Sequence, residues 1–141
     1  MSKLSIMRLN WHGLCCCEIT LDTSPGPALF CALARAATQL REQGLCDGAT
    51  SAYASLACYW RHPPAQPAER ESRIQEMVSE QLAVADSAAG RCLHIAVVYD
   101  GPDLSEVAYQ VGLSCAELVK RHAEREYCVA AIGFTPDFPY L

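Results

Sequence analysis

The sequence predicts an α+β fold, a two-layer sandwich in which helices cover one face of a mainly antiparallel sheet. Two observations lead to this prediction. Strand-like segments come as a pair at the start of the chain, and helical patterns separate the later strand-like segments. These helical patterns place apolar residues three and four positions apart, which is typical of helices that bury one side. A chain of 141 residues has the length of one domain and can bury a core.

The opening segment predicts two strands, Leu4 to Trp11 and Leu14 to Leu21, joined near His12 and Gly13. Apolar side chains alternate along both segments, as they do in strands that bury one face. The first strand places Met7, Leu9 and Trp11 on one face, and the second places Cys15, Cys17, Ile19 and Leu21 on one face.

Two amphipathic helices are predicted next, with a strand between them from Thr50 to Arg61. The first helix begins at Ser24 or Pro25, because proline suits a first turn, and it ends at Gly44. After the strand, the prolines of residues 62–67 form a rigid connector, and the second helix runs from Ala68 to Asp86. The expected buried sides are Leu29, Leu33, Ala36, Ala37 and Leu40 in the first helix, and Ile74, Met77, Val78 and Leu82 in the second.

The last third of the chain predicts a strand from Cys92 to Tyr99, two short helices, a final strand over residues 127–132 and an aromatic, proline-rich loop over 133–141. The two short helices form a small helix-turn-helix-like pair near the C-terminus. Two sequence features predict this pair. Each helix starts with an N-cap residue, which accepts a backbone hydrogen bond, and a glycine between the helices permits a left-handed turn. The caps are Asp103 with Glu106 and Ser114 with Glu117, and the glycine is Gly112.

The same pair of helices is also the pattern of a DNA-binding helix-turn-helix. A recognition helix presents donors near its N-terminus, whereas this one starts with Cys115, Ala116 and Glu117 and carries Lys120 and Arg121 late. A carboxylate facing the groove in a domain of net charge −5 opposes DNA binding. We therefore expect no nucleic-acid partner.

Composition places the chain among ordinary globular domains, with 51% apolar and 19% charged residues. Polar residues interrupt the N-terminus before any signal pattern forms, and no apolar run is long enough to span a membrane. These features predict a cytoplasmic protein without a membrane partner.

Nine cysteines raise the question of a metal or disulfide framework. There is no C-x-x-C spacing, the number is odd, and Cys15, Cys16 and Cys17 are consecutive, so on a strand they cannot face one metal. The interpretation favoured for the cysteines is structural or incidental, with a redox or metal role as the lesser alternative, and no metal site is predicted.

A series of short motifs in the last third carries a resemblance to a known family. The motifs are Tyr99, Gly101-Pro102-Asp103-Leu104, Glu106-Val107-Ala108, Gly112-Leu113-Ser114, Glu117-Leu118-Val119, His122, Tyr127, Gly133-Phe134-Thr135-Pro136 and Phe138-Pro139-Tyr140-Leu141, with a weaker match at Ala52-Tyr53-Ala54-Ser55-Leu56. In this order they resemble the first domain of the 5-oxoprolinase B-subunit family. That family also contains a sporulation kinase inhibitor and allophanate hydrolase subunit 1.

The resemblance implies that residues 1–141 form an N-terminal domain, and that the cyclophilin-like second domain usual in the family is absent from this chain. Members of the 5-oxoprolinase branch work with a C-type partner and, together with an A-type third component, open 5-oxoproline to glutamate with ATP. We therefore expect a component of an ATP-dependent hydrolase that is inactive alone. ATP would act through the assembled complex, with no cofactor bound by this domain. The alternative is a non-catalytic interaction module or histidine-kinase inhibitor.

The resemblance also suggests site residues. His122 and Asp103 are the candidate catalytic residues, and the candidate substrate-binding residues are Gly101, Pro102, Phe134, Pro136 and Tyr140. Simpler interpretations remain open, because His122 suits the last turn of a helix and Asp103 suits an N-cap. The sequence holds no phosphate-binding glycine loop and no nucleophile elbow, so it carries no complete catalytic constellation.

Two departures from the family pattern favour the interaction module. Asp137 stands where family members have a glycine, which would permit a positive φ or a close backbone approach to a ligand. The loop before Gly101 is also shorter than is usual in the family.

Overall fold

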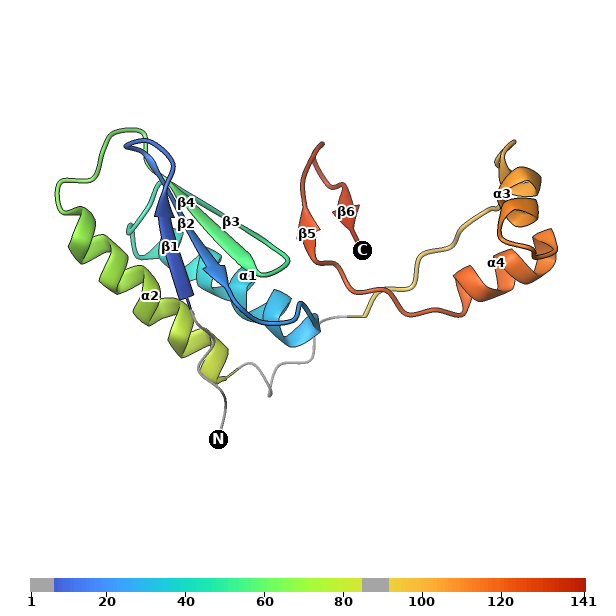
Figure 1. Cartoon of the computed structure of the whole chain (residues 1–141), viewed down its shortest axis with the longest axis horizontal. Helices are drawn as coiled ribbons and strands as arrows, with labels where there is room; N and C mark the ends of the chain where they lie inside the picture. The colour runs from blue at the N-terminus through green and yellow to red at the C-terminus, as the bar shows by residue number, and fades with distance from the viewer. Residues whose placement is uncertain (1–6, 85–91) are drawn as a thin grey trace. The chain divides into compact units, whose positions relative to one another are not determined.

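The computed structural model describes residues 7–84 and 92–141, and the chain divides into two compact units. The first unit comprises residues 1–90 together with 128–141, and the second comprises residues 91–127. A four-stranded sheet with two long helices makes up most of the first unit, and a pair of short helices makes up most of the second (Figure 1).

The sheet contains β1 (Met7–Trp11), β2 (Cys16–Leu21), β3 (Gly48–Ala52) and β4 (Ser55–Tyr59) in the order β1-β2-β4-β3, with every pair antiparallel. The predicted junction between the first two strands is confirmed. Gly13 takes a φ of +72°, which a residue without a β-carbon adopts freely, and the His12 N–H donates to the Cys16 carbonyl at 2.9 Å.

Two helices supply the second layer, α1 (Pro27–Glu42) and α2 (Pro67–Ala83). Both begin with proline in the first turn, a little later than predicted for the first helix, and Gly44 ends α1 with a φ of +65°. The predicted C-terminal end of the second helix at Asp86 lies outside the described residues.

A single core joins the sheet to both helices. Its buried members from the strands are Ile19, Leu21, Ala49, Leu56 and Cys58, and those from the helices are Leu29, Leu33, Ala36, Ala37, Leu40, Ile74, Met77 and Val78. All the predicted helix residues except Leu82, which is half-buried, are therefore in the core. Alternation along β2 buries Cys17, Ile19 and Leu21 and leaves the residues between them half-buried. The predicted two-layer α+β architecture is confirmed.

The strand predicted from Thr50 to Arg61 is wrong in one respect, because the chain reverses inside it. Two strands, β3 and β4, pair across a tight turn at Tyr53 and Ala54. Such two-residue turns need positive φ, which glycine or asparagine usually supplies. Here Tyr53 takes a φ of +49°, so no conventional turn residue marks the reversal in the sequence.

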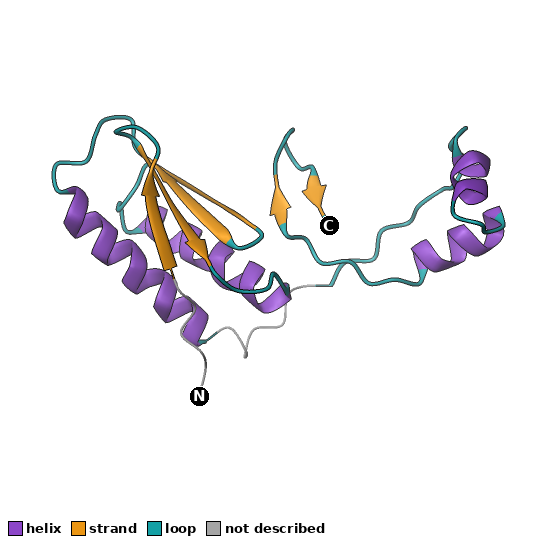
Figure 2. Cartoon of the chain, in the orientation of Figure 1, coloured by secondary structure: helices purple, strands orange, loops and turns teal. Residues whose placement is uncertain are grey.

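The strand predicted from Cys92 to Tyr99 is absent, and Figure 2 shows this segment as loop. Ile95 and Val98 are 79% and 82% exposed, and His94, expected on the strand, is exposed as well. Apolar, β-branched residues favour a strand only when a neighbouring strand accepts their backbone hydrogen bonds. Within the described part of the chain, no strand pairs with this segment.

The predicted helical pair consists of α3 (Leu104–Gln110) and α4 (Cys115–Ala123). Gly112 turns the chain with a φ of +69°, and the Leu113 N–H donates to the Ala108 carbonyl at 2.9 Å. Ser114 caps α4 as predicted, since its hydroxyl accepts from the Glu117 N–H at 3.2 Å.

Three details of the predicted capping are wrong. Asp103 occupies the N-cap position of α3, but its side chain makes no cap hydrogen bond. Its backbone is already helical there, with φ −88° and ψ −4°, whereas a capping residue needs an extended backbone to reach the first amides. The two glutamates pair along their own helices instead. Glu106 accepts from Gln110 at 3.2 Å, and Glu117 accepts from Arg121 at 3.2 Å.

The C-terminal segment is a short hairpin, where a strand followed by a loop was predicted. β5 (Ala131–Ile132) pairs with β6 (Pro139–Tyr140), so the final strand is shorter than residues 127–132 and the loop contains a strand of its own. Pro139 is tolerated because β6 is an edge strand that needs no further donor there. The hairpin lies beside β3, and the Tyr53 N–H donates to the Ala130 carbonyl at 3.4 Å.

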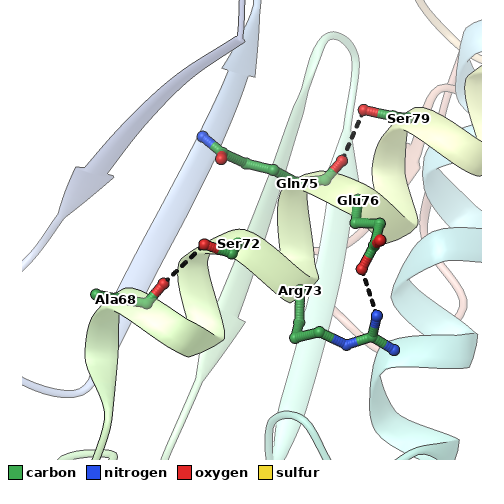
Figure 3. Close-up of polar contacts among 6 residues, drawn as sticks. All are labelled: Ala68, Ser72, Arg73, Gln75, Glu76 and Ser79. Atoms are coloured by element: carbon green, nitrogen blue, oxygen red, sulfur yellow. Dashed lines mark hydrogen bonds and ion pairs between the residues drawn. The ribbon is translucent and has the colours of Figure 1, made fainter.

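The outer face of α2 is polar and satisfied within the helix itself (Figure 3). Ser72 donates to the Ala68 carbonyl at 3.1 Å, and Ser79 donates to the Gln75 carbonyl at 2.8 Å. Arg73 and Glu76 form an ion pair one turn apart. Among the described helices, none is both long and apolar enough to cross a membrane.

Candidate functional site

The predicted catalytic residue His122 lies in the last turn of α4 and contacts Tyr99. The His122 Nδ1 is 2.6 Å from the Tyr99 hydroxyl, and the two rings meet edge to face with centroids 5.6 Å apart. The contact fixes the ring of an otherwise exposed histidine. When the hydroxyl donates to Nδ1, the proton of the neutral imidazole stays on Nε2, and that nitrogen can donate to a ligand oxygen.

Tyr127 and Arg125 extend this group. The Tyr127 ring centroid is 5.2 Å from that of His122, and the Arg125 guanidinium carbon lies 5.9 Å from the Tyr127 centroid. An arginine at that distance from a tyrosine face is held by the ring quadrupole. The second unit thus carries an aromatic cluster of Tyr99, His122 and Tyr127 with a cation at its edge. This histidine cluster combines a ring nitrogen, a hydroxyl and a positive charge, which suits an anionic or carbonyl-bearing ligand.

The other predicted catalytic residue, Asp103, lies in the turn before α3 with Gly101 and Pro102. The Leu104 N–H donates to the Gly101 carbonyl at 3.2 Å and closes this turn. A β-carbon at position 101 would sit 3.0 Å from the Asp103 Oδ1, so glycine leaves room for the carboxylate. Within the described residues, no contact joins Asp103 to His122, and the structure therefore does not bring the two predicted catalytic residues together.

The remaining predicted ligand-binding residues, Phe134, Pro136 and Tyr140, belong to the β5–β6 hairpin in the first unit. Phe138 links two of them, with ring centroids 5.9 Å from Phe134 and 5.3 Å from Tyr140. Phe134 is 87% exposed and Tyr140 is 38% exposed. The hairpin therefore presents a row of aromatic rings to solvent, a surface composition typical of binding sites.

Two residues of the hairpin tip adopt left-handed backbone conformations. Phe134 and Asp137 both have a φ of +64°. The turn between them is held by the Phe138 N–H, which donates to the Thr135 carbonyl at 3.2 Å. The glycine expected from the family pattern at position 137 would take this conformation without strain, and here aspartate takes it.

A shallow groove of about 350 Å³ lies in the first unit beside the hairpin. Its walls come from α1, β3 and residues 129–132, with Phe30, Ala37, Thr50 and Ile132 among the lining side chains and Arg41 as the cation. Tyr53 contacts Phe30 edge to face at 6.3 Å at the turn of the β3–β4 hairpin. The groove combines apolar walls with one positive charge.

Sequence reasoning missed three parts of these sites. Tyr99 and Tyr127 belong to the family motifs but are not among the predicted site residues. Nothing in their spacing from His122 predicts that their rings contact it. Phe138 is not among the predicted binding residues, although its position two residues before Tyr140 on an extended segment places both rings on one face. The groove was not expected, because its walls come from three distant segments.

The described residues contain neither a candidate metal site nor a buried polar residue. No three histidine, cysteine or carboxylate groups gather there in a way that could hold a metal ion. No polar or charged residue is buried in that part of the chain either. The candidate catalytic residues therefore lie at the surface, where a second protein surface could enclose them.

The α+β core, the helical pair and the aromatic hairpin all lie within the part of the chain that matches a known family. Residues 7–141 match the model of the family described as carboxyltransferase domain, subdomain C and D, and the chain belongs to that family.

Two relatives are similar to part of the chain. The B subunit of 5-oxoprolinase from Escherichia coli O157:H7 is 38% identical over 84 residues, which are 57% of this chain and 38% of that protein. The B subunit of 5-oxoprolinase from Bacillus subtilis (strain 168) is 35% identical over 88 residues, 58% of this chain and 37% of that protein. The chain thus matches well under half the length of these relatives.

Proposed function

We propose that this chain is the N-terminal domain of a protein of the 5-oxoprolinase B-subunit type and acts within a complex that opens 5-oxoproline to glutamate with ATP. The observation that carries the proposal is the family match over residues 7–141, together with two relatives named as the B subunit of 5-oxoprolinase. Those names imply further subunits, and we assign a homologue of the C subunit as the direct partner, with the A subunit as the second. ATP is used by the assembled complex.

The surface position of the candidate residues supports a shared active site. His122 offers a ring nitrogen held by Tyr99, but no carboxylate contacts this ring within the described residues. We expect a partner protein to supply the further groups that the reaction needs at this exposed site. His122 then positions or protonates the ring-opening substrate, and Asp103 with Gly101 and Pro102 forms part of the wall.

The test is reconstitution of the full chain with homologues of the A and C subunits, followed by measurement of ATP-dependent glutamate formation from 5-oxoproline. Activity is expected only with all components present. His122→Ala should lower the rate by about 10²–10⁴-fold if the imidazole transfers a proton. His94→Ala is the matched control, because His94 is exposed in the same unit and makes no contact with the histidine cluster. Equal activity for both variants would remove His122 from the catalytic role.

Tyr99→Phe separates positioning from proton transfer. This variant keeps the ring contact and removes the 2.6 Å hydrogen bond to Nδ1. A smaller loss of rate than in His122→Ala, together with an altered pH profile, is expected if Tyr99 orients the imidazole. An unchanged pH profile would show that the hydroxyl does not act on this ring.

The second candidate function is a non-catalytic interaction module that binds a homologue of the C subunit or a histidine kinase. The exposed aromatic row of the β5–β6 hairpin favours it, because such surfaces commonly bind proteins. Stable binding to a partner without glutamate formation in the complete mixture would select this function. DNA binding is expected to be absent. Arg121 of α4 is paired with Glu117, and an electrophoretic shift with duplex DNA at low salt would contradict this expectation.

A further inference from the structure

The proposed function leaves the outer edge of strand β3 unused. β3 is the last strand of its sheet, and among the described residues only β4 pairs with it along its length (Figure 1). The Asp47 N–H donates to the Tyr59 carbonyl at 2.9 Å, so the backbone of Tyr59 faces β3. Hydrogen-bonded and non-bonded residues alternate along an antiparallel pair, and the backbone groups of Leu56 and Cys58 therefore face β2.

Two residues of β3 consequently direct their N–H and C=O groups away from the sheet. They are Ala49 and Ser51, which lie opposite the two residues of β4 that face β2. The Tyr53 N–H, two residues further along, points the same way and donates to the Ala130 carbonyl at 3.4 Å. Within the described part of the chain, no hydrogen bond reaches Ala49 or Ser51 at this edge. Open backbone groups of this kind are a template for a further strand.

The shallow groove of about 350 Å³ runs along this edge, between α1 and residues 129–132. Among the described residues that line the groove, Arg41 is the one with a charged side chain. Its Nη2 donates to the Thr38 hydroxyl at 3.3 Å, and it forms no ion pair with a described residue. The groove therefore holds a positive charge without a counter-charge, which favours an anionic ligand.

The two ends of the groove differ in character. α1 ends at Glu42 and the chain returns into β3 at Gly48, so Arg41 lies at the end of the groove where β3 begins. At the other end, the rings of Phe30 and Tyr53 meet edge to face with centroids 6.3 Å apart. A ligand that fits both ends has a negative charge at the start of β3 and an apolar group near the end of β3.

We propose that this groove binds the carboxyl-terminal end of a peptide. The peptide adds to β3 as a short antiparallel strand, because its terminal carboxylate lies at the start of β3 and accepts from Arg41. Its backbone pairs with Ala49 and Ser51, and an apolar side chain lies against Phe30. Strand addition and capture of a terminal carboxylate are both recurring modes of peptide recognition. The proposal concerns the chain without its partner subunits and does not depend on the proposed function.

NMR spectra of the full chain labelled with nitrogen-15 test the proposal. The probe is a mixture of acetylated tetrapeptides of random sequence with free carboxylate ends, and the control mixture has amidated ends. The free-carboxylate mixture is expected to shift the amide signals of Ala49 and Ser51 and to slow their exchange with solvent severalfold. The amides of Gly48 and Thr50 face β4 in the same register, so their exchange should change much less.

A variant pair tests the role of the charge. Arg41→Gln should weaken the apparent affinity for the free-carboxylate mixture about tenfold or more, because a hydrogen bond to a charged group contributes this much. Arg41 is exposed, so the variant is expected to fold. Arg73→Gln is the matched control, since Arg73 pairs with Glu76 on the outer face of α2, and it should bind like the wild type.

Three results would overturn the proposal. The first is an equal response to the amidated mixture, which would remove the terminal carboxylate from the interaction. The second is an equal apparent affinity in Arg41→Gln and Arg73→Gln. The third is a spectrum in which neither peptide mixture changes Ala49 or Ser51, while sodium acetate still shifts the Arg41 side chain. That outcome would identify an ordinary surface cation and no peptide site.

Discussion

Asp137 adopts a backbone conformation that a glycine takes at lower cost. Its φ is +64°, in the left-handed region, where side chains with a β-carbon are strained. Aspartate tolerates this region better than most residues, which explains how the hairpin tip keeps its shape without the glycine of the family pattern. The departure at this position therefore changes the side chain and leaves the turn in place.

Substitution of Asp137 tests this account of the hairpin. Asp137→Val should weaken the β5–β6 hairpin by about 1–2 kcal/mol, because a β-branched residue is disfavoured at positive φ, whereas Asp137→Gly should not weaken it. Hydrogen exchange at Ala130 and Gly133 reports the hairpin, since their N–H groups donate to Tyr140 and Phe138 at 2.8 and 3.0 Å. Equal exchange rates in both variants would show that the turn does not hold the hairpin together.

The thiol of Cys17 makes the free energy of unfolding depend on pH. Burial, followed by the negative charge of Glu71, raises the pKa of Cys17 from 9.0 to about 11. Between these values the unfolded chain has released a proton that the folded chain still holds, so the free energy of unfolding falls as pH rises. Below pH 9 the contribution is fully present.

Denaturant titrations in the presence of reductant, at a series of alkaline pH values, measure this dependence. Cys17→Ala should flatten the decrease in the free energy of unfolding, and Cys115→Ala should not, because Cys115 is exposed. An identical pH dependence in the wild type and Cys17→Ala would mean that other groups account for the alkaline loss of stability.

At the scale of elements, the turn between α3 and α4 depends on one backbone conformation. Gly112 has a φ of +69°, and a β-carbon added there would meet no atom within 4 Å, so the cost of substitution is conformational. Gly112→Ala should destabilise the helical pair by about 1 kcal/mol, whereas Gly112→Asn should cost less, because asparagine tolerates the left-handed region.

Hydrogen exchange at Leu113, whose N–H donates to the Ala108 carbonyl at 2.9 Å, measures this effect on the pair alone. Exchange at Leu113 is expected to be slowest in the wild type, faster in Gly112→Asn and fastest in Gly112→Ala. Protection in Gly112→Ala equal to that of the wild type would show that the turn is not limited by this residue.

The elements that could be predicted from the sequence are those whose signals are local. The apolar stripes of α1 and α2 and the left-handed glycines at positions 44 and 112 depend on neighbours a few residues away, and all are present in the structure. The failures involve partners that are distant in sequence or turns without the usual residues. Tyr53 makes a tight turn that its residue type does not predict. Residues 92–99 have the composition of a strand, but no strand among the described residues pairs with them.

For the candidate site, the sequence could predict which residues take part but could not predict which side chains contact one another. The motif indicates His122, but the hydrogen bond between His122 and Tyr99, 23 residues earlier, depends on how the loop before α3 and the end of α4 meet. The pattern at Asp103 predicts a cap that its helical backbone does not permit. Contacts between side chains of distant segments require the fold, and residue spacing alone does not determine them.

At the scale of the whole molecule, the exposed apolar surface agrees with a protein that works in a complex. Aromatic rings line the β5–β6 hairpin, and Val107 and Val111 of the helical pair are 40% and 55% exposed. Side chains of this kind are commonly covered by a partner. The partner that the family resemblance implies is the proposed homologue of the C subunit.

Sedimentation velocity of the purified full chain with a homologue of the C subunit tests this central claim most directly. The chain is expected to sediment with the partner as one larger species, and Phe134→Ser should weaken that association because the ring is 87% exposed on the hairpin. Ser72→Ala is the control, since Ser72 lies on the polar outer face of α2. Separate sedimentation of the two proteins at every ratio tested would contradict the account.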